Sequence, residues 1–99
     1  MQCKGLLLSS IRSKDPVIFL EPKILYRIAE EEVPLEDFEI PLGKAEVMKE
    51  GKDLTIIGYG SQLRHVRMAV DKFEKENSGT SIEIVDLRTI SPWDQDTVY

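Results

Sequence analysis

The clearest set of residues that could support chemistry is Gly58-Tyr59-Gly60-Ser61, which follows one apolar run, with Asp86 at the end of the next. A dinucleotide site places G-x-G-x-x-G between a strand and a helix, followed by an acidic residue for the ribose. Leu63 stands where the third glycine would be. We therefore favour a tight strand-to-helix turn that needs small residues, and a small dinucleotide binder remains an alternative.

The other reactive side chains are isolated in the sequence. His65 is the single histidine and lies beside the apolar stripe of an expected helix, which favours a surface position. Cys3 is the single cysteine, so it excludes an internal disulfide, and we expect it to act as a small apolar residue. The acidic run Glu30–Glu32 predicts a solvated face, because three adjacent carboxylates cannot all face one ion.

Two short segments leave a functional and a structural interpretation open. Asp86 and Arg88 follow a predicted strand, so they either contribute to a site at the carboxyl end of a sheet or form a pair that orients the loop. Ser10, Ser13 and Asp15 surround the end of a predicted helix, where oxygen ligands could hold a hard cation. By itself, the second arrangement is also that of a generic helix end.

Hydrophobic periodicity predicts the elements of the first half. Lys4–Arg12 carries apolar side chains at helical spacing, and Asp15-Pro16 predicts a turn after it. Val17–Leu20 is a continuous apolar run, which predicts a strand buried on both faces. Residues 23–44 show neither period, so we expect an extended connector whose few apolar residues dock on a neighbouring surface.

The second half has the pattern of an α/β protein. Strands are predicted at Ala45–Lys49, Leu54–Ile57 and Ile82–Val85, and a helix capped by Ser61 is predicted to run to about Asn77. Short loops join the last two strands to this helix, which indicates a parallel βαβ unit.

A further helix is predicted to begin at Ser91-Pro92-Trp93-Asp94. Ser91 would cap it, Pro92 would take its first position and Asp94 would complete a capping box. Trp93 indicates an anchor in a core or an interface. Because this helix begins shortly before Tyr99, and the first helix has no approach segment, we expect the chain to be a fragment that spans a domain boundary.

Composition excludes several classes of protein. The 99 residues allow at most one small domain, and 18 acidic against 13 basic residues give a net charge of −5. We therefore expect no nucleic-acid partner, which would require a basic face. No apolar run has the length of a membrane-spanning helix, so no membrane partner is expected either. With one histidine and one cysteine, a zinc site of the usual kind is also excluded.

Four phrases of the sequence occur in the order and at the spacing of a known family. They are Gly5–Leu8 (GLLL), Pro16–Arg27 (PVIFLEPKILYR), Pro41–Val47 (PLGKAEV) and Asp86–Asp94 (DLRTISPWD). Together they resemble the beta subunits of thiamine-dependent branched-chain 2-oxo acid dehydrogenases, from about Lys4 to Tyr99. Pyruvate dehydrogenase beta subunits are the alternative, although they normally lack the EPK-x-LYR form and the tryptophan of SPWD. An alternative of another class is a non-catalytic α/β interaction module.

The resemblance implies an α/β fold in three parts. Residues 1–22 would end an N-terminal pyrimidine-binding domain, 23–44 would be the connector, and 45–99 would open a transketolase C-terminal-type domain. It also implies an oxidoreductase that decarboxylates 2-oxoisovalerate-type acids and passes the acyl group to lipoyl groups. The catalytic histidine of the family would lie upstream of Met1, so no catalytic or thiamine-contacting residue is expected within the chain.

The resemblance further implies partners and cofactors of the full enzyme. The partners would be the alpha subunit, in a heterotetramer, and the dihydrolipoyl transacylase core. Thiamine diphosphate and magnesium would belong to the full enzyme and not bind this chain. Potassium would bind at the turn after the first helix, where the matching positions are Ser10, Ser13 and Asp15. The location would be the mitochondrial matrix in a eukaryote or the cytoplasm in a bacterium.

Overall fold

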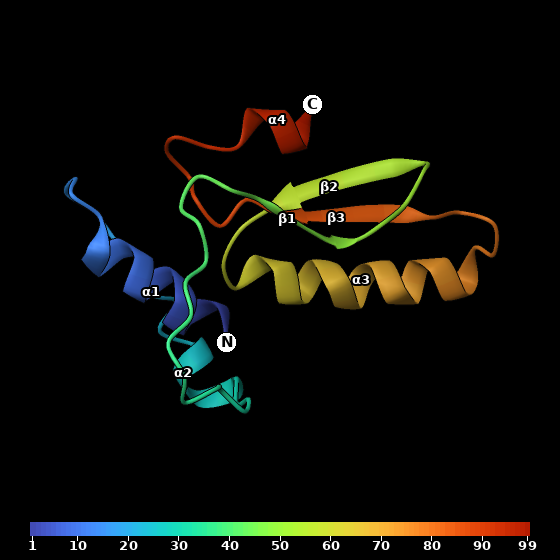
Figure 1. Ribbon diagram of the computed structural model, residues 1–99. Helices are drawn as coiled ribbons and strands as arrows, with labels where there is room; N and C mark the ends of the chain where they lie inside the picture. Colours follow the sequence, from blue (N-terminus) through green and yellow to red (C-terminus); the bar gives the residue numbers. More distant parts are fainter. The chain divides into compact units, whose positions relative to one another are not determined.

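The structure, a computed structural model, describes residues 1–99 and divides them into two compact units, Met1–Leu42 and Gly43–Tyr99. No helix combines the length and the hydropathy that crossing a membrane would require. The helices are α1 (Gln2–Arg12), α2 (Leu25–Ile28), α3 (Gln62–Glu76) and α4 (Gln95–Val98), and the strands are β1 (Glu46–Lys49), β2 (Leu54–Gly58) and β3 (Ile82–Asp86) (Figure 1).

In the first unit, α1 packs against the later segment 34–40. The Ile40 N–H donates to the Gly5 carbonyl at 3.2 Å, and the Ser9 hydroxyl donates to the Ile40 carbonyl at 2.7 Å. A Cβ on Gly5 would lie 2.7 Å from the Ile40 side chain and 2.8 Å from that of Phe38. The predicted helix is therefore confirmed, and close approach of the connector makes Gly5 and Ser9 its buried positions.

The predicted strand at Val17–Leu20 is wrong. These residues form no regular structure, and Ile18 is 89% exposed. A strand of this kind is stable only when neighbouring strands accept its backbone hydrogen bonds, and the first unit contains none. The connector is largely irregular, as expected, but it includes the single turn α2. Phe38 and Ile40 dock on α1, whereas Leu35 is 99% exposed.

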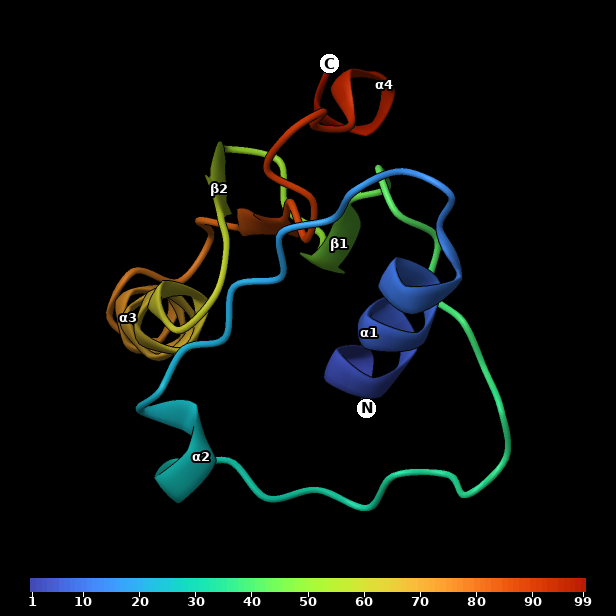
Figure 2. The same ribbon diagram turned by 90° about the vertical axis from the view of Figure 1, so that its left-hand side faces the viewer.

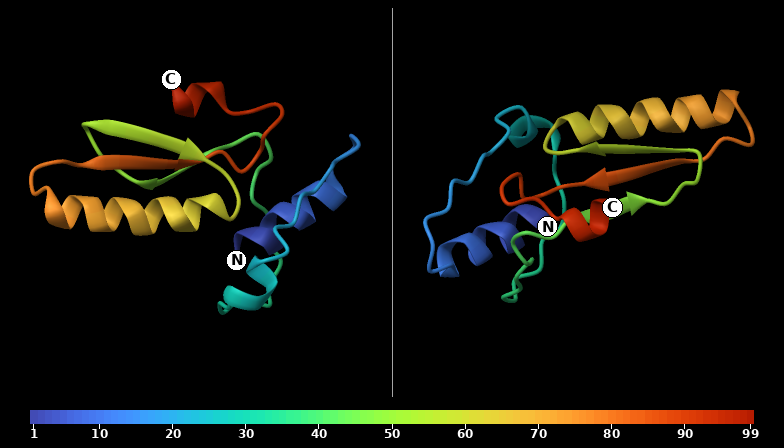
Figure 3. Two further views of the ribbon diagram at one scale, coloured as in Figure 1. Left: turned by 180° about the vertical axis from the view of Figure 1, so that it is seen from behind. Right: turned by 90° about the horizontal axis from the view of Figure 1, so that it is seen from above.

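The second unit is built on a three-stranded mixed sheet with the strand order β1-β3-β2 (Figure 3). β2 and β3 are parallel, with pairs from Leu54↔Ile82 to Gly58↔Asp86. This confirms the predicted βαβ unit, in which α3 connects the two strands. β1 pairs with the other side of β3 in the antiparallel direction, with a bulge between Val47 and Lys49. The sequence predicted this strand but not its direction.

The core lies between α3 and one face of the sheet, as the view along α3 shows (Figure 2). Leu63 and Val70 of α3 are buried against Ile82 and Ile84 of β3. The short helix α4 lies on the side of the sheet opposite α3 (Figure 1). Partly buried side chains complete the α3 side of the core: Met48, Ile56 and Val66.

Candidate functional site

Polar residues gather where β3 ends and β1 begins. The antiparallel register places Glu46 opposite Asp86, and the Arg88 guanidinium donates to the Glu46 carboxylate. The buried Asp86 carboxylate accepts the Arg88 backbone N–H at 2.9 Å, and burial raises the pKa of Asp86 above its ordinary value. With Asp94, described below, these residues are referred to as the strand-end cluster: Glu46, Asp86, Arg88 and Asp94.

Arg88 adopts a backbone conformation that is unusual for a residue with a side chain. Its φ is 56°, and the Thr89 N–H donates to the Leu87 carbonyl at 2.5 Å, which closes a γ-turn around it. The Leu87 N–H donates to the Gly58 carbonyl at 2.9 Å, so the turn is also fixed to the end of β2. The Arg88 Nε is buried without a hydrogen-bond partner. The ion pair with Glu46 is thus held in a strained turn.

Arg88→Gly should be more stable than Arg88→Ala by about 1 kcal/mol. Both variants lose the ion pair with Glu46, but glycine adopts a positive φ without steric strain, whereas alanine retains that strain. The measurement is chemical denaturation of both variants beside the unsubstituted chain. Equal stability of the two variants would show that the backbone at residue 88 relaxes once the guanidinium is removed.

Asp94 is buried, at 4% exposure, and joins the start of the unit to its last helix. Its carboxylate accepts the Ala45 N–H at 3.1 Å, the Thr97 N–H at 3.3 Å and the Thr97 hydroxyl. These bonds, led by the Thr97 hydroxyl, and the Lys44 ammonium at 3.5 Å lower the pKa of Asp94 to about 2. Asp94 is therefore the N-cap of α4.

The predicted start of this last helix is wrong by several residues. Ser91 is not its cap and Pro92 is not its first position, because the two residues lie in a turn and α4 begins at Gln95. The cap is Asp94, whose carboxylate is fixed by the distant Ala45 N–H as well as by Thr97. Trp93, predicted as an anchor, is half-buried and meets the Tyr99 ring edge-on at 5.6 Å.

Asp94→Asn should lower the melting temperature at pH 7 by roughly 5–10 °C, because an amide is a weaker acceptor for these donors. Above about pH 5 the Asp94 carboxylate is ionised in folded and unfolded chains, so its stabilisation is complete. As the pH falls to about 2, the unfolded chain binds the proton first and the stabilisation is lost. Melting curves from pH 7 to pH 2 should therefore converge for the two proteins. A constant gap would contradict this assignment.

The strand-to-helix segment is a tight turn, as favoured from the sequence. Gly60 has a φ of 65°, and a Cβ on Gly58 would lie 3.2 Å from the Leu63 side chain. Leu63 itself is buried in the core. Ser61 holds the predicted N-cap position of α3, although its hydroxyl makes no capping bond.

The isolated reactive side chains do not come together. His65 is exposed on α3, as expected, and the acidic run Glu30–Glu32 is exposed, with Glu31 paired to the N-terminal ammonium of Met1. Cys3 is exposed on α1 and so does not pack as the small apolar residue that we expected. No group of three or more His, Cys, Asp or Glu side chains could hold a metal ion.

The candidate potassium ligands lie at the end of α1. The Ser10 hydroxyl donates to the Leu6 carbonyl at 2.7 Å, and the Ser13 hydroxyl accepts the Asp15 N–H at 3.3 Å. Asp15 is exposed. Ser13 and Asp15 therefore share one turn, while the Ser10 proton is directed back along the helix.

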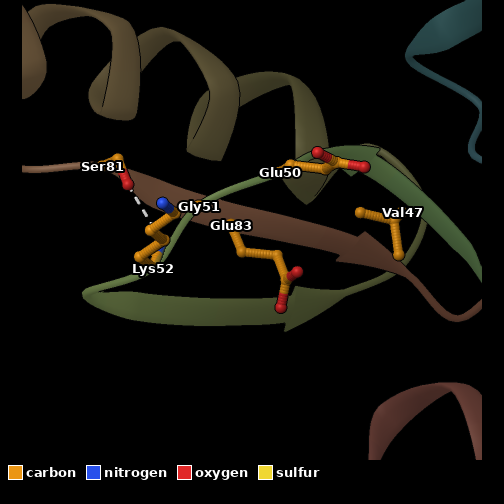
Figure 4. A pocket seen from close by; sticks show the side chains of 6 residues that line it. All are labelled: Val47, Glu50, Gly51, Lys52, Ser81 and Glu83. Carbon is orange, nitrogen blue, oxygen red and sulfur yellow. Dashed lines mark hydrogen bonds between the residues drawn. The ribbon is translucent and has the colours of Figure 1, made fainter.

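One shallow depression, of about 340 Å³, lies at the opposite end of the sheet (Figure 4). The Lys52 N–H donates to the Ser81 hydroxyl at 2.9 Å beside it, and the carboxylates of Glu50 and Glu83 point in different directions. It adjoins the amino ends of β2 and β3, whereas α/β folds collect ligands at the carboxyl ends. Its polar groups do not converge on one point. The lining residues are Val47, Glu50, Gly51, Lys52, Ser81 and Glu83.

The strand-end cluster contains no nucleophile paired with a base. Its guanidinium is already paired with Glu46, and the Lys44 ammonium lies beside Asp94. Its chemistry is therefore that of positioning, because it fixes the loop after β3 to the start of β1. For Asp86 and Arg88 the structure supports the interpretation as a loop-orienting arrangement, with Glu46 as the partner of the guanidinium. Sequence reasoning missed Glu46, since only the register across β1 and β3 brings it there.

Comparison with known proteins places the second unit in a family. Residues 43–99 match the family described as "Transketolase, C-terminal domain". The chain belongs to the transketolase C-terminal domain family. The family match and the second structural unit begin at the same residue, Gly43. The assignments of residues 1–22 to a pyrimidine-binding domain and of 23–44 to a connector stay predictions.

Relatives of this transketolase C-terminal domain protein extend the similarity to the first unit. The chain is 62% identical over 98 residues to the mitochondrial 2-oxoisovalerate dehydrogenase subunit beta of Dictyostelium discoideum, covering 99% of this chain and 26% of the relative. The corresponding subunit of Chaetomium thermophilum is 54% identical over 99 residues, covering 100% and 21%. The pyruvate dehydrogenase E1 component subunit beta of Acholeplasma laidlawii is 55% identical over 95 residues, covering 96% and 28%. The resemblance to these beta subunits is confirmed, and the chain spans about a quarter of their length.

Proposed function

We propose that this chain forms part of the beta subunit of a branched-chain 2-oxo acid dehydrogenase. The enzyme would oxidatively decarboxylate 2-oxoisovalerate-type acids and transfer the acyl group to lipoyl groups. The observation that carries this proposal is the 62% identity to a 2-oxoisovalerate dehydrogenase beta subunit over nearly the whole chain. A pyruvate dehydrogenase beta subunit is the second candidate, because a relative of that name is 55% identical.

The proposal includes the partners and the location. Its partners would be the alpha subunit and the dihydrolipoyl transacylase core, and the name "subunit beta" of the relatives supports the first of these. Two relatives carry the word mitochondrial in their names, which supports the mitochondrial matrix for a eukaryotic source.

The strand-end cluster does not fit the diphosphate of thiamine diphosphate. A diphosphate needs cationic or N–H donors, whereas the strand-end cluster has three carboxylates and its guanidinium is already paired with Glu46. No group of three or more His, Cys, Asp or Glu side chains is placed to hold a metal ion, so the chain offers no magnesium site made of protein ligands alone. We propose that both cofactors bind outside these residues. The contribution of this chain would be structural, through the docked connector and the strand-end loop.

A potassium ion at the turn after α1 belongs to the same proposal. The donor chemistry fits, because Ser10, Ser13 and Asp15 offer only oxygen ligands and Ser13 and Asp15 share one turn. Potassium chloride should slow amide exchange around Ser13 more than sodium chloride at equal ionic strength. Asp15→Asn should remove the difference, and Lys14→Ala serves as the neighbouring control. Equal effects of the two salts would contradict the potassium site.

The function is tested by exchanging this segment between enzymes. The chain replaces the matching segment of a 2-oxoisovalerate dehydrogenase beta subunit and, separately, of a pyruvate dehydrogenase beta subunit, each assembled with its own alpha subunit. Decarboxylation of the native substrate is then measured relative to the unexchanged enzyme. We expect the branched-chain hybrid to retain most of its activity and the pyruvate hybrid to lose more.

The reverse order of activities would favour the pyruvate dehydrogenase candidate. Loss of activity in both hybrids, with the subunits correctly assembled, would contradict membership of either enzyme. Assembly is checked by size-exclusion chromatography. This separates a hybrid that misfolds from a hybrid that assembles correctly but has lost activity.

A further inference from the structure

Three consecutive backbone carbonyls converge on one ammonium group in the first unit. The Lys4 Nζ donates to the carbonyl oxygens of Pro34 at 2.6 Å, Leu35 at 3.2 Å and Glu36 at 2.9 Å. The same Nζ lies 5.4 Å from the centre of the Phe38 ring. We propose that the carbonyls of residues 34–36 form a binding site for one monovalent cation, and that Lys4 fills it with its own ammonium group.

The donor set fits a monovalent cation. An ammonium group has three N–H donors and no acceptor, and the three carbonyls use all of them. The oxygens are neutral, so the site supplies dipoles and not the carboxylates that divalent ions usually recruit. The electron-rich face of the Phe38 ring adds a further favourable interaction with a positive charge.

The Lys4 ammonium group attaches residues 34–36 of the connector to α1. Hydrogen bonds from Ile40 to Gly5 and from Ser9 to Ile40 hold the following part. The Arg12 guanidinium pairs with Glu39 and Asp37, which raise the pKa of Arg12. Residues of α1 therefore bind segment 34–40 at several points. Lys4 is the only one of these groups that binds three consecutive peptide units. Without it, residues 34–36 would lose their attachment while Ile40 keeps its own.

The test is to empty the site and then offer it a free cation. In Lys4→Ala, the carbonyl ¹³C resonances of Pro34, Leu35 and Glu36 should move toward their values in an unfolded chain, because each carbonyl loses a charge-assisted hydrogen bond. Ammonium chloride at 100 mM or above should move these three resonances back toward their positions in the unsubstituted chain, whereas choline chloride at the same ionic strength should not. The unsubstituted chain should respond equally to both salts.

Lys23→Ala is the matched control, because it removes one exposed lysine from the same unit. The carbonyl resonances of residues 34–36 in this control should equal those of the unsubstituted chain. The proposal is overturned when the carbonyl resonances of residues 34–36 are the same in Lys4→Ala and Lys23→Ala. It is also overturned when ammonium and choline shift these resonances equally in Lys4→Ala.

A second measurement needs no substitution and covers the case in which Lys4→Ala loses its fold. In the ¹⁵N-labelled chain, the Lys4 Nζ protons should exchange slowly with water and show couplings across hydrogen bonds to the carbonyl carbons of residues 34–36. The ammonium groups of the exposed Lys14 and Lys23 should show averaged signals. An averaged Lys4 signal would contradict the proposal.

Discussion

Gly51→Ala is expected to destabilise the second unit by about 3 kcal/mol or more, the largest effect of any single methyl group added to this chain. Gly51 lies in the turn between β1 and β2. A Cβ there would overlap the backbone of Ile82 and Glu83, on the central strand. Backbone atoms cannot rotate away as a flexible side chain can. The turn between β1 and β2 must therefore move away from β3 and lose its close packing against that strand.

Gly43→Ala is the matched control for this substitution. Gly43 has a φ of 76°, but a Cβ there would meet nothing within 4 Å. Alanine at this position should therefore cost only the backbone strain, about 1 kcal/mol. Urea denaturation followed by the fluorescence of Trp93 measures both variants. If Gly51→Ala were no less stable than Gly43→Ala, the close contact between the turn and β3 would be wrong.

Ile84→Ala should cost about 2–5 kcal/mol, because it leaves a cavity at the centre of the core. Ile84 is 0% exposed and belongs to the cluster formed with Leu63 and Val70. As the middle residue of the central strand, it also pairs with Ile56, and its surroundings cannot collapse without moving both neighbouring strands.

Ile57→Ala tests whether the loss comes from the core or from the removal of any isoleucine. Ile57 is 44% exposed and pairs with Val85. Both residues follow core positions directly, so their side chains lie on the face of the sheet away from α3. Its replacement should cost less than about 1 kcal/mol. Denaturant unfolding of both variants provides the comparison. Equal losses would show that the buried face of the sheet has been assigned wrongly.

The elements that could be predicted from sequence are those whose evidence is local. The apolar spacing of α3, the apolar runs of β2 and β3 and the short loops between them identify the βαβ unit. The tight turn at Gly58 and Gly60 follows in the same way, because small residues between a strand and a helix have a local steric cause.

The errors arise where distant residues decide the local structure. Val17–Leu20 has the composition of a buried strand, but composition does not supply the neighbouring strands that would pair with it. Ser91 has the local pattern of a cap, yet the bond from Ala45 to Asp94 decides where the last helix begins. The positive φ of Arg88 likewise could not be predicted from the sequence, because arginine has no preference for this backbone conformation.

The position of β3 at the middle of the sheet has a consequence for the synthesis of the protein. A ribosome produces β1 and β2 before the strand that lies between them. Until residues 82–86 emerge, neither earlier strand has its partner, and their apolar residues stay without a core. The sheet therefore assembles late and in one step, and a nascent chain paused before β3 would be the form most in need of a chaperone.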